Sequence, residues 1–512
     1  MKKTLNTILA IFYPLLFPLF FILALYINNI NEVKIGDTLL SIDLAIGFSA
    51  LLIIIFYFLF KDFRKATIFS TIFLVLFFGY GPFASLFQRG PTVFVKGILI
   101  GERRGVILYG LWLALLIVSF YFLKKAKRGL DTIVVVLSII GVCLVMVPSF
   151  RIAFAQASSV GLRPKGKTFD MSGMKASKKP DPLPDIYYII LDRYPSAENL
   201  KETFGFDNSE FINWLTEKGF YVASSSKANY PFTSWSLPSS LSMDYLDKLS
   251  SEANNQTSSK KLLYQRYQDN PIWQFLKSQG YQFIYFGSWW PPTSTNKNAD
   301  KMIRYSQLPA FDGLVLGTTW LAGPLHRMNV FEDFRQTHIR TALYQFEQLA
   351  QMPKIKEPTY VFAHINLPHD PFVFDKDGNI LTEDDEEKRD RATNYTEQVI
   401  YTNKKVMRLV EELLSRSETP PIIVLQADEA IRSTDYQDIA SKMKELKILN
   451  AYYLPGVDKS VLYPSISPVN SFRLIFNLYF GTNLPLLPDR SFWVDENHPY
   501  QFYNLDGSPV TK

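Results

Sequence analysis

The sequence predicts an α/β protein in two parts: an N-terminal bundle of about five transmembrane helices, and an extracytoplasmic domain with a mainly parallel sheet between helices. Two observations predict this fold. Leu, Ile, Phe, Val and Ala fill most of the first 150 residues, whereas polar and charged residues gather after them. Beyond residue 184, short apolar runs alternate with amphipathic stretches, a pattern typical of strands covered by helices.

Five apolar runs form the predicted bundle, and each is close to the ~20 residues that a helix needs to cross a bilayer. The first run follows two lysines, as in a signal peptide, but it is long and no small-residue cleavage site follows it. We therefore expect a retained helix. The runs are Leu9–Tyr26, Leu40–Phe60, Ala66–Phe87, Val106–Leu123 and Thr132–Val147.

Basic residues beside these runs predict the orientation, because the cytoplasmic side is richer in Lys and Arg. Nine lie on the side of the N-terminus: Lys2, Lys3, Lys61, Arg64, Lys65, Lys124, Lys125, Lys127 and Arg128. Five lie on the other side: Lys34, Arg89, Lys96, Arg103 and Arg104. We therefore expect a multi-pass protein of the inner or cytoplasmic membrane, with its N-terminus inside and its C-terminal domain outside.

The predicted domains are a transmembrane part over residues 1–150, a linker over 151–183 and the extracytoplasmic domain over 184–512. The linker is rich in Gly, Ser, Lys and Pro and has no helical or strand period. The domain after it has four strand-like runs, Ile186–Leu191, Phe283–Phe286, Tyr360–Ile365 and Ile422–Leu425. Helical patterns lie between them, at Ser209–Gly219 and Tyr395–Ser415.

Charge and cysteine content exclude several classes of function. The formal charge of +6 is modest, and the basic residues do not form a basic face, so we expect no nucleic-acid partner. Cys143 is the only cysteine and lies inside an apolar run, which excludes a disulfide framework and a thiol nucleophile in the polar part. The expected partner is membrane lipid, and the sequence indicates no oligomeric state.

Acidic residues follow two of the predicted strands. Asp192 comes directly after Ile186–Leu191, and the adjacent acids Asp428 and Glu429 come just after Ile422–Leu425. Functional residues in open α/β sheets lie beyond the carboxyl ends of the strands. These carboxylates are therefore candidate metal ligands, and the alternative is a turn or solvated-surface role.

Hydroxyl and imidazole groups supply further candidates. Thr233 precedes an amphipathic run in NYPFTSWSLPSSLSMDYL, where it is either a helix cap or a nucleophile. His364 and His369 lie five residues apart in VFAHINLPHDPFVFD, and we expect both on one loop. Either histidine could bind a phosphoryl oxygen or protonate a leaving group, and the alternative is a surface histidine.

Taken in chain order, these residues resemble the alkaline phosphatase/sulfatase superfamily. The resemblance is carried by Asp192 after a strand, by Thr233 in a Thr-x-x-Ser-Leu-x-Ser-Ser-Leu setting, by the His-x4-His-Asp-Pro loop and by Asp428 after a strand, and it spans about residues 184–490. The segments ILNAYYLPG, YPSISPVNSFRLIFN and LPLLPD look like those of bacterial membrane-anchored sulfatase-like hydrolases and transferases. The layout is similar to that of lipoteichoic acid synthases and phosphoethanolamine transferases.

The resemblance implies an alkaline-phosphatase-like domain with Asp192, Thr233, Asp428 and Glu429 as metal ligands. It implies Thr233 as the nucleophile, with His369 and His364 as catalytic contacts to the substrate. The implied cofactor is one divalent metal ion, and the oxygen ligands favour Mg²⁺ or Mn²⁺ over Zn²⁺.

Two departures from the family pattern bear on activity. The family usually reads Asp-His-Gly where this chain reads Asp428-Glu429-Ala430, so a carboxylate replaces an imidazole and adds negative charge beside the ion. In the segment FGSWW, Ser288 and Trp290 stand where sulfatases tend to have Lys and His. The threonine and the second departure both favour phosphoryl over sulfuryl transfer.

Two hypotheses follow. The first is a membrane-anchored phosphoryl-group transferase or hydrolase that acts on a lipid- or glycan-linked phosphoester of the bacterial envelope through a metal-activated threonine. The second is a catalytically degenerate protein of the same fold, with a binding or scaffolding role in envelope polysaccharide assembly. The residue that separates them is Glu429 in the place of the family histidine.

Overall fold

The chain divides into two compact units, which the computed structural model describes over residues 2–29, 35–88, 94–95, 98–161, 174–252, 260–288, 291–305, 310–327, 334–430 and 439–505. The first unit combines Met1–Lys165 with Ser306–Asp333. The second combines Gly166–Tyr305 with Phe334–Lys512. Each unit has its own apolar core, as expected for a chain that is folded in two different solvents.

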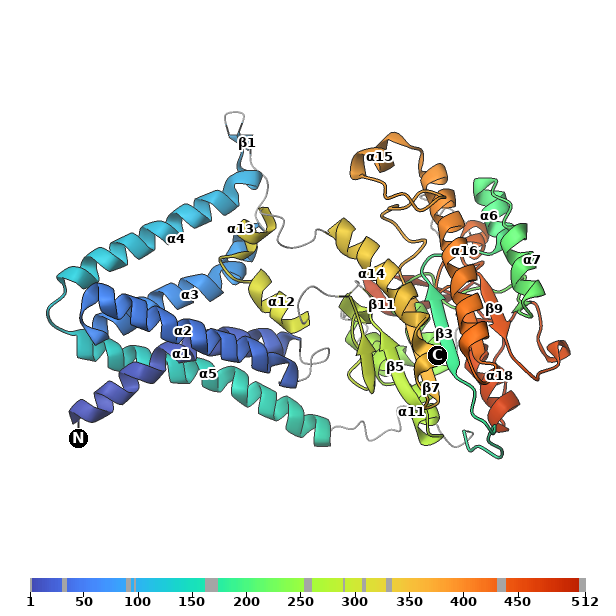
Figure 1. The fold of residues 1–512 in the computed structure, drawn as a ribbon, viewed down its shortest axis with the longest axis horizontal. Helices are drawn as coiled ribbons and strands as arrows, with labels where there is room; N and C mark the ends of the chain where they lie inside the picture. Colours follow the sequence, from blue (N-terminus) through green and yellow to red (C-terminus); the bar gives the residue numbers. More distant parts are fainter. Residues whose placement is uncertain are drawn as a thin grey trace. The chain divides into compact units, whose positions relative to one another are not determined.

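The first unit is a bundle of five helices (Figure 1): α1 (Lys2–Asn28), α2 (Leu39–Phe60), α3 (Phe63–Gln88), α4 (Ile100–Lys125) and α5 (Leu130–Gly161). Within the described residues, four of them are long and apolar enough to cross a membrane, and the described apolar part of α1 covers Phe12–Asn28. The prediction of about five apolar helices is therefore close to the structure. The turn η1 (Ile35–Thr38) precedes α2, and a small hairpin of β1 (Phe94–Val95) and β2 (Ile98–Leu99) precedes α4.

Two features of this unit differ from the expected outline. Helix α5 continues through Pro148 to Gly161, into the stretch expected to be linker. Two short helices, α12 (Ala310–Gly317) and α13 (Ala322–Arg327), come from far along the chain and belong to the same unit. Neither helix reaches the length of a transmembrane span, so no hydrophobicity signal separates them from the globular domain.

The second unit is built on a seven-stranded sheet. Its strand order is β4 (Tyr221–Val222), β9 (Asn450–Tyr453), β8 (Ile422–Gln426), β3 (Ile186–Leu191), β7 (Thr359–Ile365), β5 (Gln282–Phe286) and β6 (Lys301–Ile303). The five strands from β8 to β6 are parallel, whereas β9 is antiparallel to its neighbours β8 and β4. The predicted mainly parallel sheet is confirmed, and its four predicted strands are β3, β5, β7 and β8.

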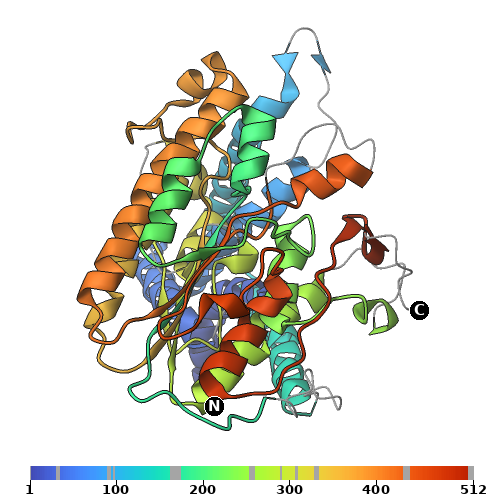
Figure 2. The ribbon, with the colours of Figure 1, turned by 90° about the vertical axis from the view of Figure 1, so that its right-hand side faces the viewer.

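Helices cover both faces of this sheet because successive side chains of each strand point to opposite faces. Tyr187 and Ile189 of β3 pack with α6 (Ala197–Phe204), α7 (Ser209–Glu217), α14 (Phe334–Leu349) and α16 (Arg391–Arg416). Ile186 and Tyr188 pack with α8 (Thr233–Ser242), α10 (Lys261–Gln268), α11 (Pro271–Ser278) and α18 (Pro468–Phe480). In Figure 2 the orange helix α16 stands on one side of the sheet and the red helix α18 on the other.

The remaining elements lie at the edges and ends of this sandwich. A C-terminal hairpin of β10 (Phe492–Asp495) and β11 (His498–Asn504) packs against Trp235 of α8. The short helices are α9 (Leu249–Glu252), η2 (Pro291–Thr293), η3 (Met352–Lys354), α15 (Glu383–Lys388), α17 (Ile439–Glu445) and η4 (Lys459–Val461). Strands β8, β3 and β7 are neighbours in the sheet. Polar residues lie at their carboxyl ends.

Candidate active site

Three neighbouring parallel strands bring Asp192, His364 and Asp428 together. Ile190 of β3 pairs with His364 of β7 on one side and with Gln426 of β8 on the other. Asp192 and Asp428 each lie two residues beyond that level, where their strands end. The parallel register therefore places two carboxylates and one imidazole at the same edge of the sheet.

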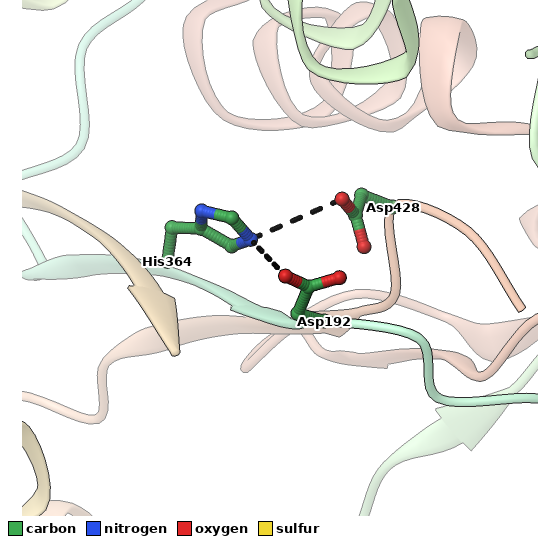
Figure 3. Close-up of side chains that lie close together, drawn as sticks. All are labelled: Asp192, His364 and Asp428. Carbon is green, nitrogen blue, oxygen red and sulfur yellow. Dashed lines mark ion pairs between the residues drawn. The ribbon is translucent and has the colours of Figure 1, made fainter. Parts of the chain in front are cut away.

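The three side chains point toward one another (Figure 3). The Nε2 atom of His364 lies 3.4 Å from Oδ2 of Asp192 and 3.9 Å from Oδ2 of Asp428. All three residues are buried. The other ring nitrogen of His364, Nδ1, lies 3.0 Å from the hydroxyl of Thr293, which orients the ring. The expectation that His364 shares a loop with His369 is wrong, because β7 continues to Ile365 and holds His364 inside the strand.

The proximity of these groups changes their protonation. Burial, together with the charge of Asp192, raises the pKa of Asp428 above its usual range. Burial opposes ionisation of Asp192 too, but the charge of His369 and the nearby imidazole of His364 hold the pKa of Asp192 below its usual value. Burial works against the charged form of His364, yet the carboxylate of Asp192 beside it raises the pKa of His364.

Glu429 is paired with Arg193. The Arg193 Nε atom lies 2.8 Å from Oε1 of Glu429, and Nη1 of the same guanidinium lies 2.7 Å from Oδ1 of Asp370. The second oxygen of Glu429 accepts a hydrogen bond of 3.1 Å from the backbone N–H of Thr233. The negative charge that the sequence places beside the metal ligands is therefore balanced by a guanidinium.

Arg193 has a strained backbone conformation in the turn after β3. Its φ of 59° lies in the left-handed region, which a side chain with a Cβ seldom adopts. The hydroxyl of Tyr395, on α16, donates a hydrogen bond of 2.7 Å to the carbonyl of Arg193. The turn after β3 is thus fixed so that Asp192 faces the cluster and Arg193 reaches Glu429.

Thr233 is the first residue of α8 and lies at the mouth of the site. Its predecessor Phe232 makes no side-chain cap, and the carboxylate of Glu429 meets the positive end of the helix instead. The hydroxyl of Ser236, one turn further along α8, donates a hydrogen bond of 2.6 Å to the carbonyl of Asp428. This bond ties the start of α8 to the end of β8. A hydrogen bond from the Thr233 side chain also opposes the upward shift in the pKa of Asp428.

A cavity of about 360 Å³ opens above these residues. His369 lies on its wall, and its Nδ1 atom lies 3.2 Å from Oδ1 of Asp370. With Asp192 and Glu429, His369 forms a second group with ligand atoms within 4.8 Å of one another. The lining residues are Asp192, Arg193, Phe232, Thr233, Ser234, Trp235, Lys260, Tyr264, Asn366, His369, Glu429 and Glu496. This is a polar cavity of a size that suits a small charged group.

The residues present fit a divalent cation. Three buried atoms make no hydrogen bond to protein: Oδ1 of Asp192, Nε2 of His364 and Oδ2 of Asp428. These residues offer ligand atoms that all lie within 4.8 Å of one another. Buried carboxylates and imidazoles without partners are costly, and a cation would satisfy all three. Two carboxylates with one imidazole suit Zn²⁺ as well as Mn²⁺.

Sequence reasoning missed three residues of the site: Arg193, Asn366 and Asp370. Asn366 donates a hydrogen bond of 2.8 Å to Oδ2 of Asp192 and so orients that carboxylate. All three lie close in sequence to predicted site residues. Arg193 follows Asp192, and Asn366 and Asp370 lie in the segment that holds both histidines. Sequence spacing does not show which neighbour turns inward.

One family model matches most of the globular unit. The family model described as Sulfatase matches residues 201–453. No curated protein sequence matches the chain.

Several solved structures are similar in fold. The periplasmic domain of EptC from Escherichia coli, in complex with Zn, has a TM-score of 0.44 and 11% identity, over 65% of this chain and 96% of that chain. The periplasmic domain of the phosphoethanolamine transferase EptC from Campylobacter jejuni has 0.38 and 11%, over 60% and 92%. The lipoteichoic acid synthase LtaP from Listeria monocytogenes has 0.38 and 12%, over 65% and 85%. Similarity at this level does not identify a substrate.

Proposed function

We propose that the protein is a membrane-anchored phosphoryl transferase or hydrolase, because the Sulfatase family model matches residues 201–453 of its chain. Its substrate is a lipid- or glycan-linked phosphoester of the bacterial envelope, and its nucleophile is Thr233. The orientation inferred from the basic residues puts the catalytic domain outside the cytoplasmic membrane. There the helical anchor keeps the site beside lipid-linked substrates.

One observation carries this proposal: Thr233 lies at the N-terminus of α8, on the wall of the cavity that Asp192 and Glu429 also line. A hydroxyl in this place has three aids to attack on phosphorus. The helix N-terminus favours an incoming anion, and Glu429, whose Oε2 atom accepts a hydrogen bond from the N–H of Thr233, is a nearby proton acceptor. Arg193 and His369 on the same wall can contact the oxygens of a phosphoryl group.

Asp192, His364 and Asp428 would hold the divalent metal ion, which would supply Lewis acidity to a phosphoester when bound. The imidazole that the family pattern places after the strand aspartate comes here from β7, as His364. This ligand set no longer favours Mg²⁺ over Zn²⁺, because an imidazole suits Zn²⁺ and Mn²⁺ better than Mg²⁺. Glu429, paired with Arg193, supports the site from beside the metal.

The chemistry divides into two displacements. In the first, the Thr233 oxygen forms a bond to phosphorus, its proton passes to Glu429, and the bond from phosphorus to the leaving alcohol breaks. His369 donates the proton that the leaving alkoxide needs. In the second, water or an acceptor alcohol attacks the phosphothreonine and loses its proton to His369, the bond from phosphorus to the Thr233 oxygen breaks, and Glu429 returns the proton to that oxygen. The choice between water and alcohol decides between hydrolysis and transfer.

The test is covalent labelling of Thr233 in the full-length protein in detergent. The protein is mixed with bis(p-nitrophenyl) phosphate and a divalent metal, quenched in acid, and analysed by peptide mass spectrometry. We expect a p-nitrophenyl phosphoryl group on Thr233 and release of one p-nitrophenol. Thr233→Ala should lose both signals, whereas Thr216→Ala, which removes an exposed threonine on α7, should keep them.

The scaffolding alternative gives a different result. If the folded, metal-loaded protein neither releases p-nitrophenol nor carries phosphate, and if natural lipid extracts also leave Thr233 unmodified, the phosphoryl-transfer proposal fails. Turnover that persists in Thr233→Ala would instead refute the threonine mechanism and retain an enzyme.

A further inference from the structure

The segment Ser306–Asp333 belongs to the membrane unit although the sequence on both sides of it belongs to the globular unit. Its described part is a pair of short helices, α12 and α13, joined by a turn at residues 318–321. Figure 1 shows both helices in yellow among the blue helices of the bundle. Phe311 and Val315 of α12 are buried in the same apolar cluster as Tyr26 and Phe77. The helical hairpin is therefore part of the core of the bundle.

The turn of this hairpin exchanges backbone hydrogen bonds with α3. In a regular helix the N–H of Gly81 would donate to the carbonyl of Phe77. Here the N–H of Gly81 donates to the carbonyl of Thr318 at 2.7 Å, and the carbonyl of Phe77 accepts from the N–H of Trp320 at 2.9 Å. The exchange lies beside Pro82, which lacks an N–H and weakens the helix at this point.

Hydroxyl groups satisfy further carbonyls at the turn. The hydroxyls of Thr318 and Thr319 donate to the carbonyls of Val315 and Leu316 near the end of α12, at 2.8 and 2.7 Å. The hydroxyl of Tyr109, on α4, donates to the carbonyl of Trp320 at 2.7 Å. Irregular backbone is tolerated in a bilayer only where its polar groups are satisfied by protein, and these bonds of the turn are all made to protein.

Two glycines allow this close approach. A Cβ at Gly81 would lie 2.7 Å from the carbonyl oxygen of Thr318, and a Cβ at Gly323 would lie 2.6 Å from the hydroxyl of Tyr109. Both distances are below 3.0 Å, which real Cβ atoms essentially never show. At Gly81 the atom met is backbone, so a side chain there would push the hairpin away, whereas at Gly323 the end of the Tyr109 side chain would have to move. Glycine at position 81 is therefore required by the packing of the hairpin and not by backbone conformation.

The depth of the turn can be measured along the helices. The basic ends of α3 and α4 lie together, since Nζ of Lys65 donates to the carbonyl of Lys124 at 3.1 Å. Gly81 is sixteen residues beyond Lys65 on α3, and Tyr109 is sixteen residues before Lys125 on α4. At 1.5 Å per residue both lie ~24 Å from the basic ends, inside a hydrocarbon layer of ~30 Å. Phe77 lies ~18 Å from them.

The start of the hairpin lies at the opposite boundary. The hydroxyl of Ser41 donates a hydrogen bond to Asp312 of α12. Ser41 is twenty residues before Lys61 on α2, or ~30 Å along the helix. The hairpin thus begins at the boundary far from the basic residues, and its turn lies deeper. Leu314 and Leu321 face outward from it with 45% and 43% of their surface exposed.

We propose that residues 310–327 form a re-entrant hairpin that dips into the bilayer from the side opposite the basic helix ends. Its outer face, with Leu314 and Leu321, contacts lipid acyl chains. The occupant of this face is lipid because the helices beside it expose apolar side chains at the same depth, such as Leu44 and Ile107. The chain between β6 and α14 is therefore anchored in the membrane independently of the linker that follows α5.

The test is cysteine labelling of the full-length protein in lipid nanodiscs, where both membrane faces are open to a charged maleimide. The background is Cys143→Ala. Leu314→Cys and Leu321→Cys are compared with Val136→Cys on a span and with Leu486→Cys on the globular unit, both at exposed positions. We expect the two hairpin cysteines to react at the slow rate of Val136→Cys. Reaction of either one at the rate of Leu486→Cys would overturn the proposal.

A second pair of variants tests the close approach. Gly81→Val should expel the turn and speed the labelling of Leu314→Cys at least about tenfold, because the exposed backbone is costly in lipid. Gly47→Val is the matched control, since a Cβ at Gly47 meets no atom within 4 Å. Equal labelling rates of Leu314→Cys in both variants would contradict the proposed packing of the hairpin against α3.

Discussion

At the scale of single residues, the pairing of Glu429 with Arg193 changes what the replacement of the family histidine by Glu429 implies for the charge of the site. A carboxylate in place of the family histidine would leave a metal site overcharged if it stood alone. In the structure that carboxylate is 2% exposed and in contact with a guanidinium that also reaches Asp370. The charges of Glu429 and Asp192 raise the pKa of Arg193, although burial opposes this, so the guanidinium stays charged.

Replacing Arg193 alone should therefore lower the free energy of unfolding more than replacing Arg193 and Glu429 together. Arg193→Met leaves Glu429 as a buried, unpaired carboxylate, and we expect a loss of about 3 kcal/mol in the free energy of unfolding. The double variant Arg193→Met with Glu429→Gln should recover most of this loss. Thermal unfolding of the four proteins of this cycle, in one detergent, is the measurement. Additive effects would show that the pair is not coupled.

A second buried group, His338 on α14, predicts the acid response of the globular unit. Burial lowers the pKa of His338 to about 3, whereas the imidazole of an unfolded chain titrates near 6.5. Below pH ~6.5 the His338 side chain of the unfolded chain therefore binds a proton, whereas that of the folded chain stays neutral. The free energy of unfolding falls by about 1.4 kcal/mol per pH unit until pH ~3. Above pH ~6.5 the neutral imidazole causes no such loss.

The measurement is the unfolding temperature between pH 7 and pH 4. His338→Phe should lose less stability than the parent as the pH falls, so the gap between the two should close or reverse. His498→Gln is the control, because that histidine is 51% exposed beside Asp495. Parallel curves for parent and His338→Phe would show that the buried imidazole does not set the acid response.

At the scale of elements, a side-chain hydrogen bond from Ser236 to the carbonyl of Asp428 helps to hold α8 to the end of β8. Loss of this bond should let the start of α8 move relative to the carboxylates. If Thr233 is the nucleophile, we expect Ser236→Ala to lower kcat by about tenfold, since small misplacements of reacting atoms are costly. KM should change little.

The matched control is Ser240→Ala in the same helix. The hydroxyl of Ser240 donates back to the carbonyl of Ser236, within α8. Both serines are buried, so both substitutions create a similar void. The measurement is kcat of both variants under saturating substrate. A loss in Ser236→Ala alone would show that the bond to Asp428 positions Thr233, whereas an equal loss of kcat in both variants would show that only the packing of α8 matters.

Much of the element structure could be predicted from the sequence, for a physical reason. The β-branched and aromatic runs that became β3, β5, β7 and β8 are buried on both faces, so they carry an unmistakable apolar signal. The family match confirms the predicted superfamily. Helices α12 and α13 were not predicted as membrane elements, because their apolar lengths are ordinary for a globular protein.

The site was only partly predictable. Strand ends identify Asp192 and Asp428 as neighbours, because parallel strands end at the same edge. The predicted strand Tyr360–Ile365 already contained His364, but the spacing to His369 suggested a shared loop, and spacing alone does not show that β7 brings the His364 side chain to Asp192. The partner of Glu429 depends on the left-handed turn at Arg193, which no composition rule predicts for an arginine.

At the scale of the whole molecule, the excess of basic residues at one end of the bundle predicts its orientation. Lys65 and Lys124 contact each other at that end, as expected if they share the cytoplasmic face. We expect a fluorescent protein that matures only in the cytoplasm to stay dark when it is fused after Lys512. The same fusion after Lys125 should be bright. The reverse pattern would place the globular unit in the cytoplasm and exclude envelope substrates.

The most direct test of the account is metal binding by the purified full-length protein, measured by calorimetry with Mn²⁺ and Zn²⁺. The central claim is that His364, and not Glu429, completes the ligand set with Asp192 and Asp428. We expect saturable binding of about one ion, lost in His364→Phe and in Asp428→Asn, and retained in Glu429→Gln. Loss of binding in Glu429→Gln together with its survival in His364→Phe would contradict the account and restore the ligand set that the sequence alone suggested.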